Sequence, residues 1–103
     1  MTDKIYTSAE LRDILLPIIT KYKADKAFLF GSYARNEADK DSDIDVLVIG
    51  GDRFDPTDIF CIADELHRAS SKNVDVYEER EINPASAFYN NILKERIEIV
   101  KVG

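Results

Sequence analysis

Two short apolar segments on either side of a Gly-Ser turn constrain the fold of this chain more than any other feature. The segments are "KAFLF" at 26–30 and "IDVLVI" at 44–49. The first is apolar on both faces, and the second is apolar apart from one aspartate, a composition typical of interior strands covered by other elements. The pattern therefore predicts a small sheet whose strands lie inside the protein.

Helical patterns alternate with these strands. Thr7 and Glu10 form a capping-box pattern before the apolar periodicity of 11–22, in which Pro17 predicts a kink or a late restart. Asp55 precedes a second helix and Asn83, followed by proline, a third. "NVDVYEE" at 73–79 and "RIEIVKV" at 96–102 complete the strands. We expect one α/β domain over 1–103, a small mixed sheet packed with helices.

Composition narrows the classes of function. The chain has a net charge of −6 and lacks the basic footprint that broad nucleic-acid binding requires, so we expect no direct nucleic-acid partner. A basic protein partner or a cation-dependent site remains compatible with this charge. A single cysteine excludes an internal disulfide, and neither a signal pattern nor a membrane-length apolar run is present. We therefore expect a cytoplasmic protein with no membrane association.

Three aspartates occupy unusual places in the strand patterns. Asp43 and Asp45 lie one residue apart, so alternation puts them on the same face about 7 Å apart. Asp75 takes a similar position in the next strand pattern and can join them if the strands are neighbours. Clustered carboxylates repel one another unless a cation sits among them, and oxygen-only ligands favour Mg²⁺ or Mn²⁺. The alternative is that Asp43 begins the strand and Asp45 faces solvent.

The Gly-Ser turn predicts an anion site. Gly31 and Ser32 follow one strand and enter a short helix, an arrangement that presents free backbone N–H groups to a phosphate. Gly31 permits close backbone approach, Ser32 adds a hydroxyl, and Arg35 can reach an anionic oxygen. An ordinary tight turn is the alternative. Beside the aspartates, the turn would complete a site for a metal–nucleotide complex.

The combined motif "GSYARNEADKDSDIDVLV", with "VDVY" downstream, resembles the MNT-type minimal nucleotidyltransferases of the DNA polymerase β-like superfamily. The resemblance implies their minimal nucleotidyltransferase fold. It implies that Asp43 and Asp45 bridge two Mg²⁺ ions (with Mn²⁺ as a substitute), while Asp75 ligates the catalytic ion and helps to activate the attacking hydroxyl. Gly31 and Ser32 would bind the triphosphate of ATP, supported by Arg35.

The resemblance also implies a biological role. Relatives of this size are commonly antitoxins that transfer AMP from ATP to a hydroxyl, here expected to be a tyrosine, of a HEPN-type ribonuclease toxin. A binding-only antitoxin with a vestigial nucleotide site and a transferase acting on a small-molecule hydroxyl are the alternatives. Two departures from the family stand out. Asn36 replaces a glycine found in many members, and we expect no second, substrate-binding domain.

Overall fold

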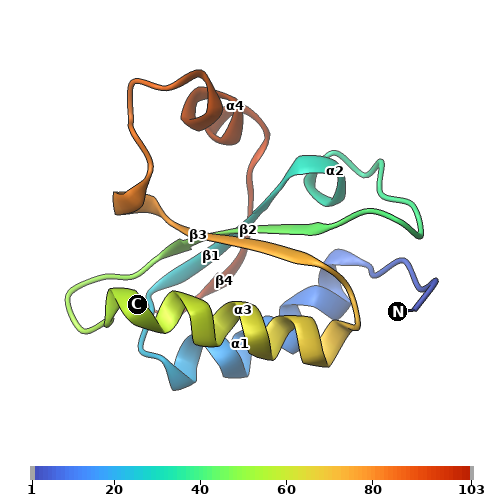
Figure 1. Ribbon diagram of the computed structural model, residues 1–103, viewed down its shortest axis with the longest axis horizontal. Helices are drawn as coiled ribbons and strands as arrows, with labels where there is room; N and C mark the ends of the chain where they lie inside the picture. The colour runs from blue at the N-terminus through green and yellow to red at the C-terminus, as the bar shows by residue number, and fades with distance from the viewer. Residues whose placement is uncertain (1, 103) are drawn as a thin grey trace.

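The computed structural model describes residues 2–102 and alternates helices with strands, as expected (Figure 1). The elements in chain order are α1 (Ser8–Lys21), β1 (Lys26–Phe30), α2 (Gly31–Ala34), β2 (Ile44–Ile49), a 3₁₀ turn (Pro56–Asp58), α3 (Ile59–Ser70), β3 (Val74–Glu78), a second 3₁₀ turn (Glu79–Glu81), α4 (Ala87–Glu95) and β4 (Ile97–Lys101).

The four strands form one mixed sheet in the order β3-β2-β1-β4. β1 pairs antiparallel with both β2 and β4, whereas β2 and β3 run parallel. Antiparallel neighbours that follow each other along the chain need only a loop, but the parallel pair needs a crossover, which α3 supplies. The predicted α/β class with a small mixed sheet is confirmed.

The helices are divided unequally between the two faces of the sheet. α1 and α3 lie side by side against one face, and α2 and α4 lie on the other side (Figure 1). The main core is formed between the sheet and the first pair of helices, and it contains Ile44, Val46 and Val48 of β2, all fully buried. This face is called the covered face below.

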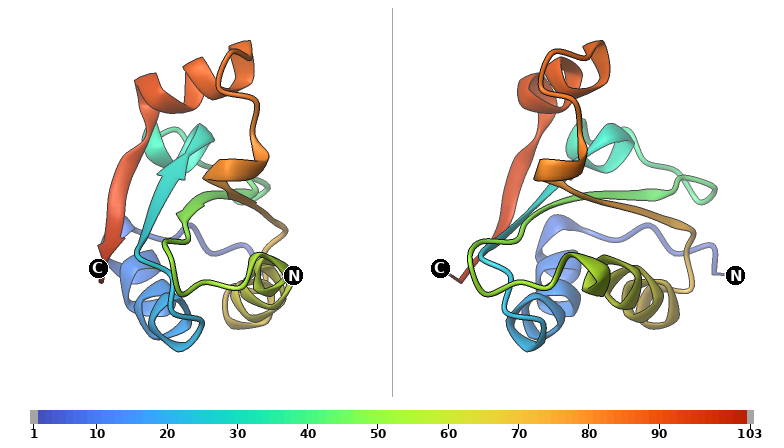
Figure 2. Two further views of the ribbon diagram at one scale, coloured as in Figure 1. Left: turned by 90° about the vertical axis from the view of Figure 1, so that its left-hand side faces the viewer. Right: turned by 60° about the vertical axis from the view of Figure 1, so that its left-hand side comes forward.

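The opposite face, called the open face, has a much smaller core. Its buried members are Phe30, Leu47, Ile82 and Ile92, the last contributed by α4. Figure 2 shows α4 standing away from the sheet on the segments that lead into it and out of it. Much of the open face therefore remains accessible beside α4.

The helix starts agree in part with the sequence patterns. Thr7 and Glu10 form the predicted capping box at α1, with reciprocal hydrogen bonds of 3.0 and 3.1 Å. α1 continues through Pro17 without a restart. Pro17 lies on the exposed side of the helix, where water can satisfy the carbonyl that loses its N–H partner. None of the helices within residues 2–102 is long and apolar enough to cross a membrane.

Two later helix starts differ in detail from the prediction. Asp55 caps as expected, but the turn that it opens is 3₁₀ before α3 begins at Ile59. The predicted cap at Asn83 is wrong for α4. Asn83 instead accepts a hydrogen bond from the Ala85 N–H in a turn, and Ser86 caps the helix by accepting from the Tyr89 N–H. Proline after Asn83 suits that turn as well as it suits a helix start.

Candidate functional site

The strand register brings two of the three aspartates together. Asp45 in β2 lies directly opposite Asp75 in β3, and the pairs Val46–Val76 and Ile44–Val74 flank them. Side chains alternate along both strands, so the two carboxylates face the open side while the valines pack toward α3. Asp43 immediately precedes β2 and is exposed, as is Asp75, whereas Asp45 is half-buried.

Asp45 carries the electrostatic cost of this arrangement. Its pKa is raised to about 6, chiefly because burial desolvates the carboxylate. The adjacent Asp75 adds to the rise through its charge and a side-chain hydrogen bond, and Asp43 and Glu95 add smaller like-charge contributions. A carboxylate strained by desolvation and repulsion would gain from a nearby cation.

The Gly-Ser turn lies against this same carboxylate. Gly31 follows β1 directly and has φ +69°, a left-handed conformation that glycine adopts without strain. A Cβ placed on Gly31 would lie 2.2 Å from Asp45 Oδ2, so no side chain fits there. Ser32 is half-buried in the first turn of α2. The structure therefore brings the predicted anion turn into direct contact with Asp45, one of the predicted metal ligands.

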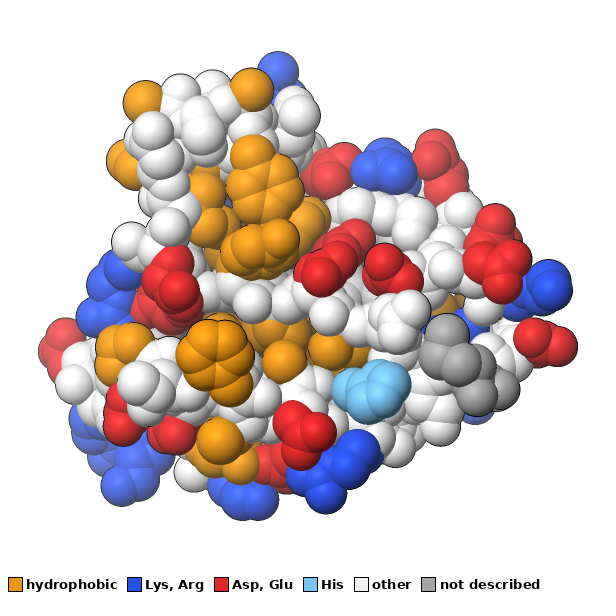
Figure 3. Space-filling view, viewed as in Figure 1, with side chains coloured by type: hydrophobic (Ala, Val, Ile, Leu, Met, Phe, Trp, Pro, Cys, Tyr) orange, Lys and Arg blue, Asp and Glu red, His pale blue; other side chains and the backbone are white. Residues whose placement is uncertain are grey.

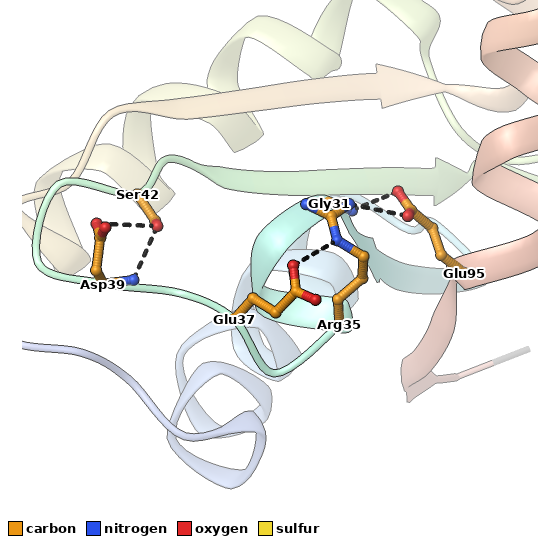
Figure 4. Close-up of polar contacts among 6 residues, drawn as sticks. All are labelled: Gly31, Arg35, Glu37, Asp39, Ser42 and Glu95. Carbon is orange, nitrogen blue, oxygen red and sulfur yellow. Dashed lines mark hydrogen bonds and ion pairs between the residues drawn. The ribbon is translucent and has the colours of Figure 1, made fainter.

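Arg35 is the C-cap of α2 and lies between two acidic residues. Its Nη1 donates to Glu95 Oε2 at 2.9 Å and its Nε donates to Glu37 Oε2 at 3.1 Å (Figure 4). The pKa of Arg35 is raised first by Glu95 and then by Glu37. Asn36 has φ +59°, and asparagine tolerates this left-handed region better than most residues. Asn36 thus meets the conformational requirement expected of the glycine that it replaces.

Glu95 is the functional candidate that the sequence patterns did not indicate. It is the last residue of α4, and its Oε1 accepts a hydrogen bond of 2.9 Å from the Gly31 N–H. The pKa of Glu95 is lowered, first by this backbone hydrogen bond and then by the one from Arg35. The residues are 64 positions apart, so only the fold brings them together.

The loop that leads to Asp43 is held at two points. The Asp39 N–H donates to Ser42 Oγ at 2.9 Å, and Ser42 Oγ donates to Asp39 Oδ1 at 3.3 Å (Figure 4). The ammonium of Lys72, whose side chain is only 2% exposed, donates to the Lys40 carbonyl at 2.6 Å. These contacts fix the approach of the chain to Asp43.

An aromatic cluster adjoins the aspartates on the open face. Phe30, Tyr77 and Phe88 pack with ring centroids 5.3–6.1 Å apart, and Phe30 pairs with Asp45 in the strand register. Tyr77 and Phe88 remain 37% and 43% exposed. In Figure 3 hydrophobic side chains gather beneath α4 with acidic side chains directly beside them. The cluster docks α4 on the sheet and leaves an apolar surface next to the carboxylates.

The donor set suits a hard cation, although the side chains are not arranged as a finished cage. Within residues 2–102 no three acidic, histidine or cysteine side chains converge closely enough to hold a metal ion. Asp45 and Asp75 nevertheless supply oxygen donors side by side, and burial together with the neighbouring Asp75 raises the pKa of Asp45. The metal-binding assignment of Asp43, Asp45 and Asp75 therefore stays a prediction.

Comparison with known proteins places the chain in a family. Residues 14–102 match the family model "Polymerase beta, Nucleotidyltransferase". A relative from Methanocaldococcus jannaschii named "Putative protein adenylyltransferase" is 35% identical over 91 residues, which cover 88% of this chain and 96% of the relative. A second protein of that name from the same organism is 32% identical and covers 82% of this chain and 89% of its own. The chain belongs to the polymerase beta nucleotidyltransferase family.

Solved structures agree with this assignment. One described as a "putative minimal nucleotidyltransferase" is 30% identical with a TM-score of 0.70, and the match covers 84% of this chain and 86% of the other. A toxin–antitoxin structure with AMP-PNP has a TM-score of 0.74 at 20% identity, covering 88% and 73%, and so supports the fold. The predicted resemblance and the nucleotidyltransferase class are confirmed.

Proposed function

We propose that this protein is a metal-dependent nucleotidyltransferase that moves AMP from ATP to a tyrosine hydroxyl of a HEPN-type ribonuclease toxin and acts as its antitoxin. One observation carries the proposal: the backbone of Gly31 touches Asp45, which in turn faces Asp75. An anion-binding turn next to a carboxylate pair suits a metal–nucleotide complex, because the turn can bind the phosphates and the carboxylates can bind the metal.

Each residue has a part in the proposed reaction. The Gly31–Ser32 turn and Arg35 would bind the triphosphate. Asp43 and Asp45 would hold two Mg²⁺ ions, and Asp75 would ligate the catalytic one. The bound ions would neutralise charge on the phosphates and lower the pKa of the attacking hydroxyl. The acceptor oxygen bonds to the α-phosphorus, the bond from that phosphorus to the bridging oxygen breaks, and pyrophosphate leaves. Asp75 is placed to help remove the hydroxyl proton.

A protein acceptor suits the exposure of the site. Asp43 and Asp75 are both exposed, so a partner can present its own hydroxyl in line with the α-phosphate. The net charge of −6 favours a partner with a basic surface, such as an enzyme that cleaves RNA. Support also comes from a structural neighbour of TM-score 0.60, described as a tri-AMPylated HEPN toxin of Shewanella oneidensis in complex with MNT antitoxin.

The test uses the protein together with the product of the gene next to its own, Mg²⁺ and ATP labelled in the α-phosphate. We expect mass spectrometry to locate AMP on a tyrosine of the partner, and we expect Asp75→Asn to abolish the adduct. Label found only on a small molecule would support the small-molecule transferase instead. Inhibition of the partner that persists without Asp43, Asp45 and Asp75 would support the binding-only antitoxin.

A further inference from the structure

A carboxylate already occupies the turn to which we assign the triphosphate. Glu95 Oε1 accepts from the Gly31 N–H and Glu95 Oε2 accepts from Arg35 Nη1, both at 2.9 Å (Figure 4). The glutamate comes from the end of α4, and its side chain is 24% exposed. Two oxygens of one anion thus engage the backbone donor and the guanidinium that a phosphate would engage.

The contacts keep Glu95 in its ionised form. A backbone N–H and a guanidinium both stabilise a carboxylate, and they lower the pKa of Glu95 in that order. An incoming anion that takes over these donors must remove a charged acceptor from each of them. It must also approach Asp45, whose carboxylate lies against Gly31. Both requirements disfavour a small anion that arrives without a cation.

We infer that Glu95 is an internal competitor of the triphosphate and determines which anions the turn accepts. The inference rests on the proposed function, because it concerns the same turn. A nucleoside triphosphate carrying Mg²⁺ replaces both contacts of Glu95 and brings a positive charge close to Asp45 and Asp75. Inorganic phosphate replaces one contact or both but brings no such charge, so the glutamate excludes it.

A purely structural role for Glu95 leads to the opposite expectation. If the glutamate only holds α4 in place, its removal loosens the site and weakens nucleotide binding. If it competes, its removal exposes the Gly31 N–H and frees one side of Arg35, and binding tightens. Glu37 offers a matched control. It accepts a hydrogen bond from the same guanidinium at 3.1 Å, but among residues 2–102 it makes no hydrogen bond to Gly31.

Calorimetry of the whole protein with ATP and Mg²⁺, and separately with inorganic phosphate, tests the inference. We expect Glu95→Ala to bind Mg²⁺–ATP roughly tenfold more tightly, since hydrogen bonds to charged groups are among the strongest to displace. We also expect this variant to gain measurable phosphate binding, while Glu37→Gln stays within about twofold of wild type. Unchanged or weaker ATP binding by Glu95→Ala overturns the inference.

A second measurement tests the inference even if Glu95→Ala does not fold, because it uses the wild-type protein. The carboxyl carbon of Glu95 and the amide of Gly31 are followed by NMR during titration with Mg²⁺–ATP. Both signals should shift with one midpoint, and a Glu95 signal that stays unchanged at saturation overturns the inference while leaving the proposed function intact. If neither wild type nor any variant binds Mg²⁺–ATP, both proposals fail.

Discussion

The two faces of this sheet are built from the same strands but have opposite properties. On the covered face, Ile44, Val46 and Val48 of β2 are completely buried beneath helices. On the open face, the intervening positions of β2 and β3 hold Asp45 and Asp75. Because side chains alternate along a strand, neighbouring residues of β2 serve either the hydrophobic core on one face or the proposed site on the other.

The contrast shows how a small chain can tolerate a site that opposes its own folding. The raised pKa of Asp45 indicates that its ionised carboxylate is unfavourable where it lies. The apolar residues on the other side of the same strand stabilise it through hydrophobic burial. Substitutions on the two faces should therefore affect activity and stability in opposite ways.

Asp45→Asn should produce the largest effect. We expect transfer of AMP to fall about a thousandfold or more, equivalent to roughly 4 kcal/mol of transition-state stabilisation. The metal-free protein should keep its melting temperature or gain slightly, because one of several like charges is removed. Transfer rates and thermal unfolding measured on the same sample check both parts. A clear loss of stability without metal would make Asp45 a structural residue.

Leu29→Ala on the covered face should show the reverse behaviour. Leu29 is completely buried in the main core, so the truncation should lower the free energy of unfolding by about 3 kcal/mol. Leu93→Ala provides the matched control, since Leu93 lies in α4 with 43% of its surface exposed and should lose far less. Urea titrations give both values. Equal losses in the free energy of unfolding would contradict the view that the covered core stabilises the protein more than the exposed surface of α4 does.

Gly31→Ala should combine both kinds of damage. The new Cβ would lie 2.2 Å from Asp45 Oδ2, and the fold would keep the alanine at φ +69°. We expect the free energy of unfolding to fall by about 2 kcal/mol. Gly51→Ala is the control, because Gly51 has φ +77° and an equally close carboxylate, that of Asp25, away from the site. Both variants should lose stability, but only Gly31→Ala should lose ATP affinity. Equal affinities in calorimetry would argue against an anion site at Gly31.

The shifted pKa of Asp45 should also make a smaller contribution, visible in the pH dependence of the free energy of unfolding. The folded pKa of about 6 exceeds the ordinary 3.8, so between these values the native state binds more protons than the unfolded state. This contribution is fully present below about pH 4 and is lost as the pH rises through 6. Its size should be about 1–2 kcal/mol after allowance for solvent screening. The difference in unfolding free energy between wild type and Asp45→Asn, followed across pH without metal, isolates it.

Local patterns predicted much of the fold and several residues of the candidate site. The Thr7 and Glu10 capping box depends on residues three positions apart, and the shared face of Asp45 and Asp75 follows from strand alternation once the strands are neighbours. The turn at Gly31 was also predictable, because a glycine–serine pair between a strand and a short helix leaves backbone N–H groups free.

Contacts between distant segments were not predictable. Glu95 is the last residue of α4, a position at which an acidic residue predicts no particular contact. Only the packing of α4 on the open face brings it to Gly31. Lys72 resembles a solvated lysine in the sequence, yet the structure buries it against the Lys40 carbonyl. The cap of α4 at Ser86 rather than Asn83 was missed because both residues are good caps, and tertiary contacts decide between them.

The claim that the anion turn and the carboxylates form one site is tested most directly by the affinity for ATP with and without Mg²⁺. Calorimetry should show strong binding only when both are present, because in the proposed site the turn at Gly31 binds the triphosphate and Asp43, Asp45 and Asp75 hold the cations. ATP alone and Mg²⁺ alone should each bind weakly. Equal affinity for ATP in the presence and absence of Mg²⁺ would contradict the account.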